Sequence, residues 1–144
     1  MEESQPADLK ARVEHYQSTY RHANLERFEV SQPYSLFPQE GQTSTLKWGD
    51  EWPNSRRTGV YLVYSDGGLL YVGTAWMLGS RLACYFRSED RRDGRCKIIR
   101  PDWAESKYVV TIAVPEKSWF EAAALEEYLI YELKPSLNKI GGIV

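Results

Sequence analysis

The sequence predicts a small α+β domain, and two features of its 144 residues indicate this class. Residues 60–65 and 69–73 are rich in β-branched and aromatic side chains and enclose an Asp-Gly-Gly turn, which is typical of a β-hairpin. A third run of this kind, 107–114, lies between two stretches with helical spacing. This order favours a three-stranded antiparallel sheet flanked by helices.

Two helices are predicted around the third strand. Residues 76–87 place their leucines on one side of a helix. The last helix is expected to begin with a capping box, because Ser118 and Glu121 have the required spacing. It should end near Leu133, since Pro135 disfavours a helical conformation at the residue before it.

An N-terminal helical arm precedes the hairpin. Residues 6–28 carry apolar residues at helical spacing, namely Leu9, Val13, Tyr16 and Tyr20. Residues 29–57 are rich in Pro, Gly, Ser and Gln, which predicts a wrapping connection without regular structure. We therefore expect residues 1–58 to form a helix and wrapping extension, and residues 59–144 to form the α+β domain.

Two tryptophans of this extension, Trp48 and Trp52, have three open roles. They could stack on unpaired bases, mediate a dimer, or cover the core sheet. Covering the sheet is the simplest of the three.

Composition indicates one globular domain, with 42% hydrophobic and 13% aromatic residues. No apolar run approaches the roughly 20 residues of a membrane span, and the polar, acidic start differs from a signal peptide. We expect a cytoplasmic protein without a membrane partner. Cys84 and Cys96 are too few for a zinc cluster and are interpreted as reduced thiols.

The net charge of −2 argues weakly against a dedicated nucleic-acid-binding protein, but the charges are unevenly distributed. Residues 81–100 contain seven basic and three acidic residues. This stretch is either a solvated loop or a contact for nucleic acid. The candidate nucleic-acid-binding residues are Arg87, Arg91, Arg92, Arg95, Lys97 and Arg100.

Five short motifs follow one another on these elements: Gly59-Val60-Tyr61, Tyr71-Val72-Gly73, Arg81, Glu126 and Asn138. In this order they resemble the GIY-YIG nuclease domain, over residues 59 to about 140. The segments YVGTAWMLGSRLACYF and LEEYLIYELKPSLN are most similar to the N-terminal nuclease domain of the endonuclease subunit of bacterial nucleotide excision repair.

The resemblance implies a metal-dependent endonuclease that hydrolyses DNA phosphodiester bonds. It makes Tyr61 the general base toward water, Tyr71 an assisting hydroxyl and Arg81 the ligand of the phosphate, while Asn138 orders the site. A phenol near a metal ion and an arginine can lose its proton well below the reference pKa of about 10. Alternatively, both tyrosines are ordinary strand aromatics that pack the core.

Glu126 is the candidate metal ligand, because its carboxylate emerges from an apolar helix surface where an unpaired charge is costly. A hard cation, Mg²⁺ or Mn²⁺, would compensate it. Glu127 has similar apolar neighbours, and only the spacing of the family selects Glu126. One site carboxylate favours one metal ion.

Two positions at the edge of the motifs are candidate accessory residues. Thr74 stands where the family often has lysine, and Tyr85 stands where relatives have histidine or tyrosine. The resemblance implies DNA as the partner and leaves RNA, a homodimer or a larger protein complex open. Two further interpretations of the function stay open. The chain could be a non-catalytic nucleic-acid-binding or assembly module, or a nuclease subunit of a larger complex.

Overall fold

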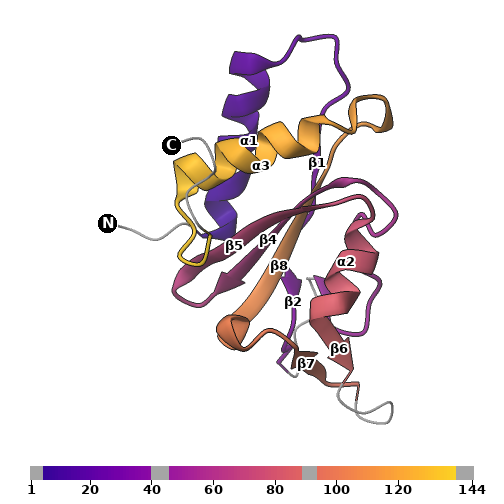
Figure 1. The fold of residues 1–144 in the computed structure, drawn as a ribbon, viewed down its shortest axis with the longest axis vertical. Coiled ribbons are helices and arrows are strands. Elements are labelled where there is room, and N and C mark those ends of the chain that lie inside the picture. Colours follow the sequence, from indigo (N-terminus) through magenta and orange to yellow (C-terminus); the bar gives the residue numbers. More distant parts are fainter. Residues whose placement is uncertain (1–4, 40–45, 89–93, 139–144) are drawn as a thin grey trace.

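The computed structural model describes residues 5–39, 46–88 and 94–138, and it confirms the α+β class. A twisted sheet runs through the middle of the molecule (Figure 1). Helices α1 (Pro6–Tyr20) and α3 (Glu121–Leu133) pack on one face of this sheet, and α2 (Leu78–Tyr85) packs on the other. The sheet therefore separates two layers of helices.

The centre of the sheet is built from β4 (Gly59–Ser65), β5 (Gly68–Ala75) and β8 (Ser106–Ala113). Strand β4 lies between the other two and is antiparallel to both. The predicted hairpin is confirmed, and the Ser65 hydroxyl accepts a hydrogen bond from the Gly67 amide in its turn. Strand β5 is left at the edge of the sheet.

The sheet is larger than the predicted three strands. Strands β1 (Glu29–Val30), β2 (Tyr34–Ser35) and β3 (Leu46–Lys47) extend it on the far side of β8. The prediction that residues 29–57 lack regular structure is wrong for these pairs. They are too short to show an alternating pattern. Strands β1 and β2 form because the free edge of β8 offers unpaired backbone groups, and β3 pairs with β2.

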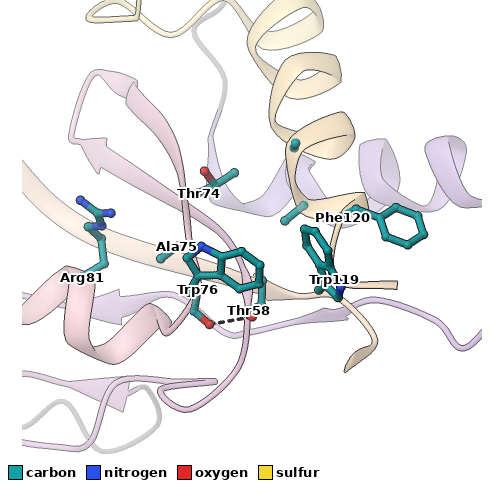
Figure 2. Close-up of a pocket in the computed structure, with 9 residues that line it drawn as sticks. Thr58, Thr74, Ala75, Trp76, Arg81, Trp119 and Phe120 are labelled. Atoms are coloured by element: carbon teal, nitrogen blue, oxygen red, sulfur yellow. Dashed lines mark hydrogen bonds between the residues drawn. The ribbon is translucent and has the colours of Figure 1, made fainter. Parts of the chain in front are cut away.

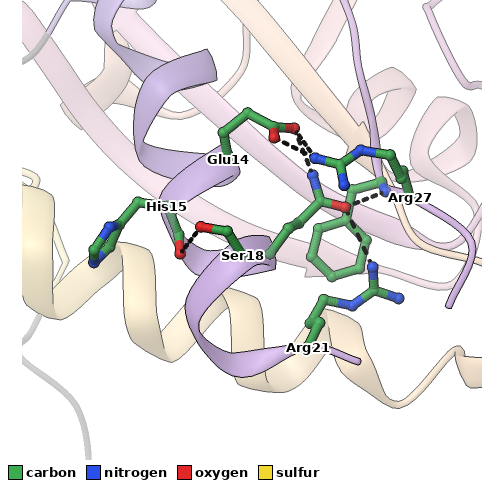
Figure 3. A network of polar contacts seen from close by, with 7 residues as sticks. Glu14, His15, Ser18, Arg21 and Arg27 are labelled. Carbon is green, nitrogen blue, oxygen red and sulfur yellow. Dashed lines mark hydrogen bonds and ion pairs between the residues drawn. The ribbon is translucent and has the colours of Figure 1, made fainter. Parts of the chain in front are cut away.

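Helix α1 ends earlier than the pattern of residues 6–28 predicts. Arg21 is extended, and the chain turns back so that the ring of Phe28 packs against Tyr16 at 5.9 Å between centroids. The side-chain oxygen of Gln17 accepts hydrogen bonds from Arg21 and from the Phe28 amide, and so replaces the missing helical turn (Figure 3).

Helix α3 begins later than predicted, because a 3₁₀ turn occupies residues 116–118. Phe120 is the N-cap residue, so the predicted capping box is wrong. The Ser118 hydroxyl instead donates to the carboxylate of Glu121 at 2.5 Å. The predicted end at Leu133 is confirmed, and Lys134 follows in the left-handed conformation.

The basic segment after α2 is not a simple loop. Strands β6 (Phe86–Ser88) and β7 (Cys96–Ile98) form a small separate hairpin, and a 3₁₀ turn, η1 (Pro101–Trp103), leads into β8. Residues 86–88 and 96–98 are therefore strands, where the sequence predicts the end of a helix and a solvated loop. Arg91 and Arg92 lie outside the described residues.

Two apolar clusters fill the space on either side of the sheet. The first lies under α1 and α3, and the second lies under α2 and is closed by the N-terminal extension. Trp48 and Trp52 pack against the second cluster, with the Trp52 ring 4.4 Å from that of Tyr34. The prediction that these tryptophans cover the sheet is confirmed.

The described residues contain two free cysteines, Cys84 at the surface and Cys96 in the interior, as predicted. Within the same residues, none of the helices combines the length and the apolar character needed to cross a membrane.

A buried ion pair joins α1 to α3. The guanidinium of Arg21 donates two hydrogen bonds to Glu121, at 2.7 and 2.8 Å, and the two side chains are 5% and 13% exposed. Burial acts to raise the pKa of Glu121, but hydrogen bonds from Arg21 and Ser118 outweigh it, so the pKa is lowered. The charged pair is therefore the stable form at neutral pH.

Glu121→Ala should destabilise the protein by about 3 kcal/mol, because it leaves the buried Arg21 charge without its partner. Arg27→Ala is the matched control: Arg27 pairs with Glu14 at the surface, and its loss should cost less than about 1 kcal/mol. Urea unfolding measures both. Because the pKa of Glu121 is lowered on folding, the stabilisation should fade as the pH falls through and below 4.5. Equal losses in the two variants would contradict the assigned role of the buried pair.

Candidate active site

The two outer glycines of the hairpin are required by close contacts inside the sheet. A side chain on Gly59 would lie 1.9 Å from the carbonyl oxygen of Ile112 on β8. A side chain on Gly73 would lie 2.4 Å from the phenol end of Tyr61, which is its partner across the hairpin. The Tyr61 ring therefore packs directly against Gly73 and fills the space that a side chain there would need.

Tyr61 belongs to a group of three phenols on the α2 face of the sheet. Its ring centroid lies 6.1 Å from that of Tyr71 and 6.4 Å from that of Tyr85. Burial raises the pKa of Tyr61 above its usual 10, the neighbouring phenols raise it further, and Arg81 lowers it only in part. The protein alone therefore does not give Tyr61 the low pKa that the resemblance implies, and its phenol is neutral at neutral pH.

Arg81 is placed by the start of α2. Two backbone carbonyls cap this helix in place of a side chain: Ser55 accepts from the Gly79 amide at 2.8 Å, and Arg57 accepts from the Leu78 amide at 3.0 Å. One turn later, Arg81 is exposed and hydrogen-bonds to Tyr85, and this contact raises the pKa of the guanidinium. The structure therefore brings Arg81, Tyr85 and Tyr61 together.

A second cation borders the phenols. The Arg100 guanidinium lies 4.4 Å from the ring centroid of buried Trp103 and 5.3 Å from that of Tyr71. Its pKa is raised, chiefly by a hydrogen bond to Asp102. The aromatic spacing of the sequence predicted neither the burial of Trp103 nor its contact with Tyr71.

Glu126 lies on the opposite face of the sheet from the phenols. Alternation along β5 places Tyr71 on the α2 face, whereas Thr74 faces α3 and hydrogen-bonds to the half-buried carboxylate of Glu126. Burial and the neighbouring Glu127 raise the pKa of Glu126, and the bond from Thr74 lowers it in part. Thr74 is therefore the direct contact of the candidate metal ligand.

The two faces meet around the edge of β5 at one cavity of about 260 Å³. Arg81 and Ala75 line it from the α2 side, Thr74 lines it from β5, and the first turn of α3 lines it through Ala122 and Ala123 (Figure 2). Glu126 follows one turn after these alanines. The cavity is thus lined by Arg81 and by Thr74, which is the hydrogen-bond partner of Glu126.

Asn138 contacts the backbone of β5 through its side chain. Its amide nitrogen donates to the Val72 carbonyl at 2.9 Å, and its oxygen accepts from the Val72 amide at 2.7 Å. The Leu137 amide donates to the Leu70 carbonyl in the same way. Asn138 therefore pairs the C-terminal segment with the open edge of β5 and positions the strand that carries Tyr71 and Thr74.

The predicted basic residues are unequally placed. Arg87 and Lys97 are exposed and stand directly opposite each other on the β6–β7 hairpin, and Arg95 is exposed just before β7. Like charges in such a pair repel one another unless an anion lies between them. Arg100 differs because its charge is engaged by Asp102.

Sequence reasoning missed an aromatic surface at the same cavity. Trp76, Trp119 and Phe120 line it and are exposed (Figure 2). The sequence pattern predicts Trp76 within a helix, but that helix begins at Leu78. It predicts Trp119 and Phe120 within a capping box, which does not form. The adjacent Trp-Phe pair ahead of an alanine-rich helix was the available signal.

Comparison with known proteins decides the family. The family described as the UvrC-like GIY-YIG domain matches residues 57–139, more than half of the chain. The chain belongs to this family. The matched segment contains the hairpin, α2, the basic region and α3, so all five motifs fall within it.

Relatives named UvrABC system protein C are similar to the chain. The protein of Methanosphaera stadtmanae is 36% identical over 95 residues, which is 65% of this chain and 15% of the relative. That of Chlorobaculum tepidum is 36% identical over 81 residues, 56% of this chain and 12% of the relative. The chain thus corresponds to a small part of these relatives. No solved structure matches the chain significantly.

Gly73→Ala should destabilise the protein by about 1–3 kcal/mol, because the new methyl group would overlap the Tyr61 ring. In the background of Tyr61→Ala the same change should cost far less, since the ring is absent. Urea unfolding of the four proteins of this double-mutant cycle gives the coupling energy. Additive effects would show that the Tyr61 ring is not seated on Gly73.

Proposed function

We propose that this GIY-YIG domain is a metal-dependent endonuclease that hydrolyses DNA phosphodiester bonds. The observation that carries the proposal is the cavity at the edge of β5, where Arg81 from α2 and Thr74, the hydrogen-bond partner of Glu126, line the same space. A phosphate bound there has a permanent cation on one side and a carboxylate nearby. These are the groups that phosphoryl-transfer chemistry requires.

Arg81 binds the scissile phosphate in this proposal. Its guanidinium is exposed and keeps its charge at any physiological pH. It can offer two parallel hydrogen bonds to phosphate oxygens. The bond to Tyr85 orients the group toward Tyr61, so the phosphate is presented to the phenols.

Glu126 would hold the divalent cation. Its half-buried carboxylate has a raised pKa caused by burial and by Glu127, which is the environment that a bound cation would relieve. The described residues contain no cluster of three or more acidic, histidine or cysteine side chains. The donor set fits Mg²⁺ or Mn²⁺, which bind through one carboxylate, water and substrate phosphate. When bound, the ion supplies positive charge to the phosphate oxygens.

Tyr61 is the proposed general base. Because its pKa is raised by burial, it carries its proton in the resting site and must lose it before it can accept one from water. The adjacent Arg81 charge favours the phenolate. Tyr71 borders the same ring and stands between it and Arg100.

The β6–β7 hairpin is the proposed backbone contact. Exposed Arg87 and Lys97 face each other across it, and a DNA phosphate would relieve their repulsion. The hairpin continues directly from α2, which carries Arg81. One strand of nucleic acid could therefore touch both.

A second candidate is the nuclease domain of a larger assembly. The match with UvrABC system protein C covers only 12–15% of those relatives. A unit of this size has little surface with which to read sequence, so a partner would have to select the substrate. A non-catalytic module is the outcome to expect if metal does not support cleavage.

Glu126→Gln should reduce metal-dependent DNA cleavage by at least about 100-fold, because it removes the charge that holds the cation. Its stability at neutral pH should equal or exceed that of the wild type, since the raised pKa shows that ionised Glu126 is disfavoured by the fold. Labelled single-stranded, duplex and branched DNA in Mg²⁺, Mn²⁺ or EDTA provide the assay.

Glu127→Gln is the matched control, because Glu127 is the exposed neighbour on the same helix. It should keep near wild-type cleavage. Full activity of Glu126→Gln would refute the metal role of Glu126, and equal loss in both variants would remove the distinction between the two carboxylates.

The rate of cleavage should rise with pH. A phenol with a raised pKa is mostly protonated below that pKa, and its phenolate fraction grows tenfold per pH unit. The logarithm of the rate should therefore rise with a slope near 1 over about pH 6–9 without a plateau. Tyr61→Phe should lower the rate by about 100-fold or more and flatten the residual profile. A slope that persists in Tyr61→Phe would assign the titration to another group.

A further inference from the structure

Three large aromatic side chains are exposed around the mouth of the cavity. Trp76 is 67%, Trp119 49% and Phe120 60% exposed. Exposed aromatics that gather at one place on a protein mark a binding surface more often than single exposed residues do. The proposed phosphate and metal chemistry uses none of these rings.

Trp76, Trp119 and Phe120 form one contiguous aromatic surface, called the platform below. The Trp76 and Trp119 centroids lie 4.8 Å apart with planes inclined by 38°, and Phe120 meets Trp119 edge-on at 5.7 Å. In Figure 2 the two indoles lie side by side, with Arg81 beyond one end and Phe120 beyond the other. The residues come from the end of β5 and the start of α3, which lie far apart in the sequence.

The platform is held in place before any ligand binds. The Thr58 hydroxyl donates to the Trp76 carbonyl at 2.6 Å, which fixes the backbone between β5 and α2 (Figure 2). The Ala122 amide donates to the Trp119 carbonyl at 3.2 Å and ties the second indole to the start of α3. The backbone that carries both indoles is therefore fixed, so a ligand would not have to order these segments.

The platform and the candidate phosphate ligand share one cavity. Arg81, Trp76 and Trp119 all line the same space of about 260 Å³, with the hydroxyls of Thr58 and Thr74 between them. A flat apolar ring beside a guanidinium and hydroxyl groups matches the chemistry of a nucleotide, which presents a base, a sugar and a phosphate. An apolar protein partner would bury the charge of Arg81 without an anion beside it, which is costly.

We propose that Trp76 and Trp119 stack on an unpaired nucleobase adjacent to the phosphate held by Arg81. This inference rests on the proposed nuclease function and specifies its substrate class. The faces of a base inside a duplex are covered by its neighbours, so the platform requires a base that has left the stack. The substrate is therefore single-stranded or locally unpaired nucleic acid.

Binding in EDTA separates stacking from cleavage. The probes are a labelled single-stranded oligonucleotide and a backbone of equal length built from abasic sites, which keeps the phosphates and lacks the bases. Trp76→Ala should bind the normal oligonucleotide about 5- to 150-fold more weakly than the wild type does. The same variant should bind the abasic backbone as the wild type does, and Trp76→Phe should recover most of the affinity.

Tyr131→Ala is the matched control, because Tyr131 is 69% exposed on α3, the helix that follows Trp119 and Phe120, but lies outside the cavity lining. It should bind both probes like the wild type. Equal affinity of Trp76→Ala and Tyr131→Ala for the normal oligonucleotide would overturn the inference. So would a loss of the same size on the abasic backbone, which would assign Trp76 to the fold or to phosphate binding.

A second copy of the chain is the other ligand that could cover the platform, and sedimentation velocity tests for it. Self-association that Trp76→Ala abolishes, together with unchanged oligonucleotide binding, would make the platform a dimer interface and overturn the stacking role. Failure of the inference is distinct from failure of the proposed function. Metal-dependent cleavage with unchanged binding by Trp76→Ala defeats only the inference, whereas a wild-type protein that neither binds nor cuts any substrate defeats both.

Discussion

The packing of the Tyr61 ring against Gly73 is the contact on which the arrangement of the candidate site depends. The two residues are direct partners across the β4–β5 hairpin, and the space that any side chain at Gly73 would take is filled by the phenol. The ring is thereby fixed next to Tyr71 and Tyr85 and within the field of Arg81. The same burial that fixes the phenol disfavours its ionisation. Packing thus fixes the orientation of the phenol but raises its pKa, so in the proposed mechanism the bound substrate and cation would have to favour the phenolate.

The edge position of β5 resolves a second difficulty, which is that the candidate groups lie on both faces of the sheet. Tyr61 and Tyr71 face α2, whereas Thr74 and Glu126 face each other on the α3 side. In the middle of a sheet such groups could not act on one ligand. At the edge, one cavity is lined both by Thr74, the hydrogen-bond partner of Glu126, and by Arg81 from the α2 side. Asn138 contributes here by pairing with Val72, because it satisfies part of the open edge without covering the end where the cavity lies.

The sequence predicted those parts of the molecule whose physics is local. The hairpin follows from its turn and its β-branched residues, and the end of α3 follows from Pro135. The short strands β1 to β3 could not be predicted, since two residues carry no periodicity. They form because β8 offers a partner to β1 and β2, and β2 in turn offers one to β3. The site residues were found by motif, but their environment was not. The raised pKa of Tyr61, the pairing of Asn138 with a backbone and the exposure of Trp76 all depend on contacts between segments distant in the chain.

The N-terminal extension takes part in building the site. The family match begins at residue 57, yet the first turn of α2 is capped by Ser55 as well as Arg57. A side chain on Gly79 would approach Ser55 to 2.6 Å, so this part of the helix is packed directly onto the extension. Arg81 stands two residues further along the same helix. Because the extension also pairs with β8 and covers the second apolar cluster, it sets both the stability of the sheet and the direction of the arginine. The geometry of the candidate site is thus a property of the whole described chain.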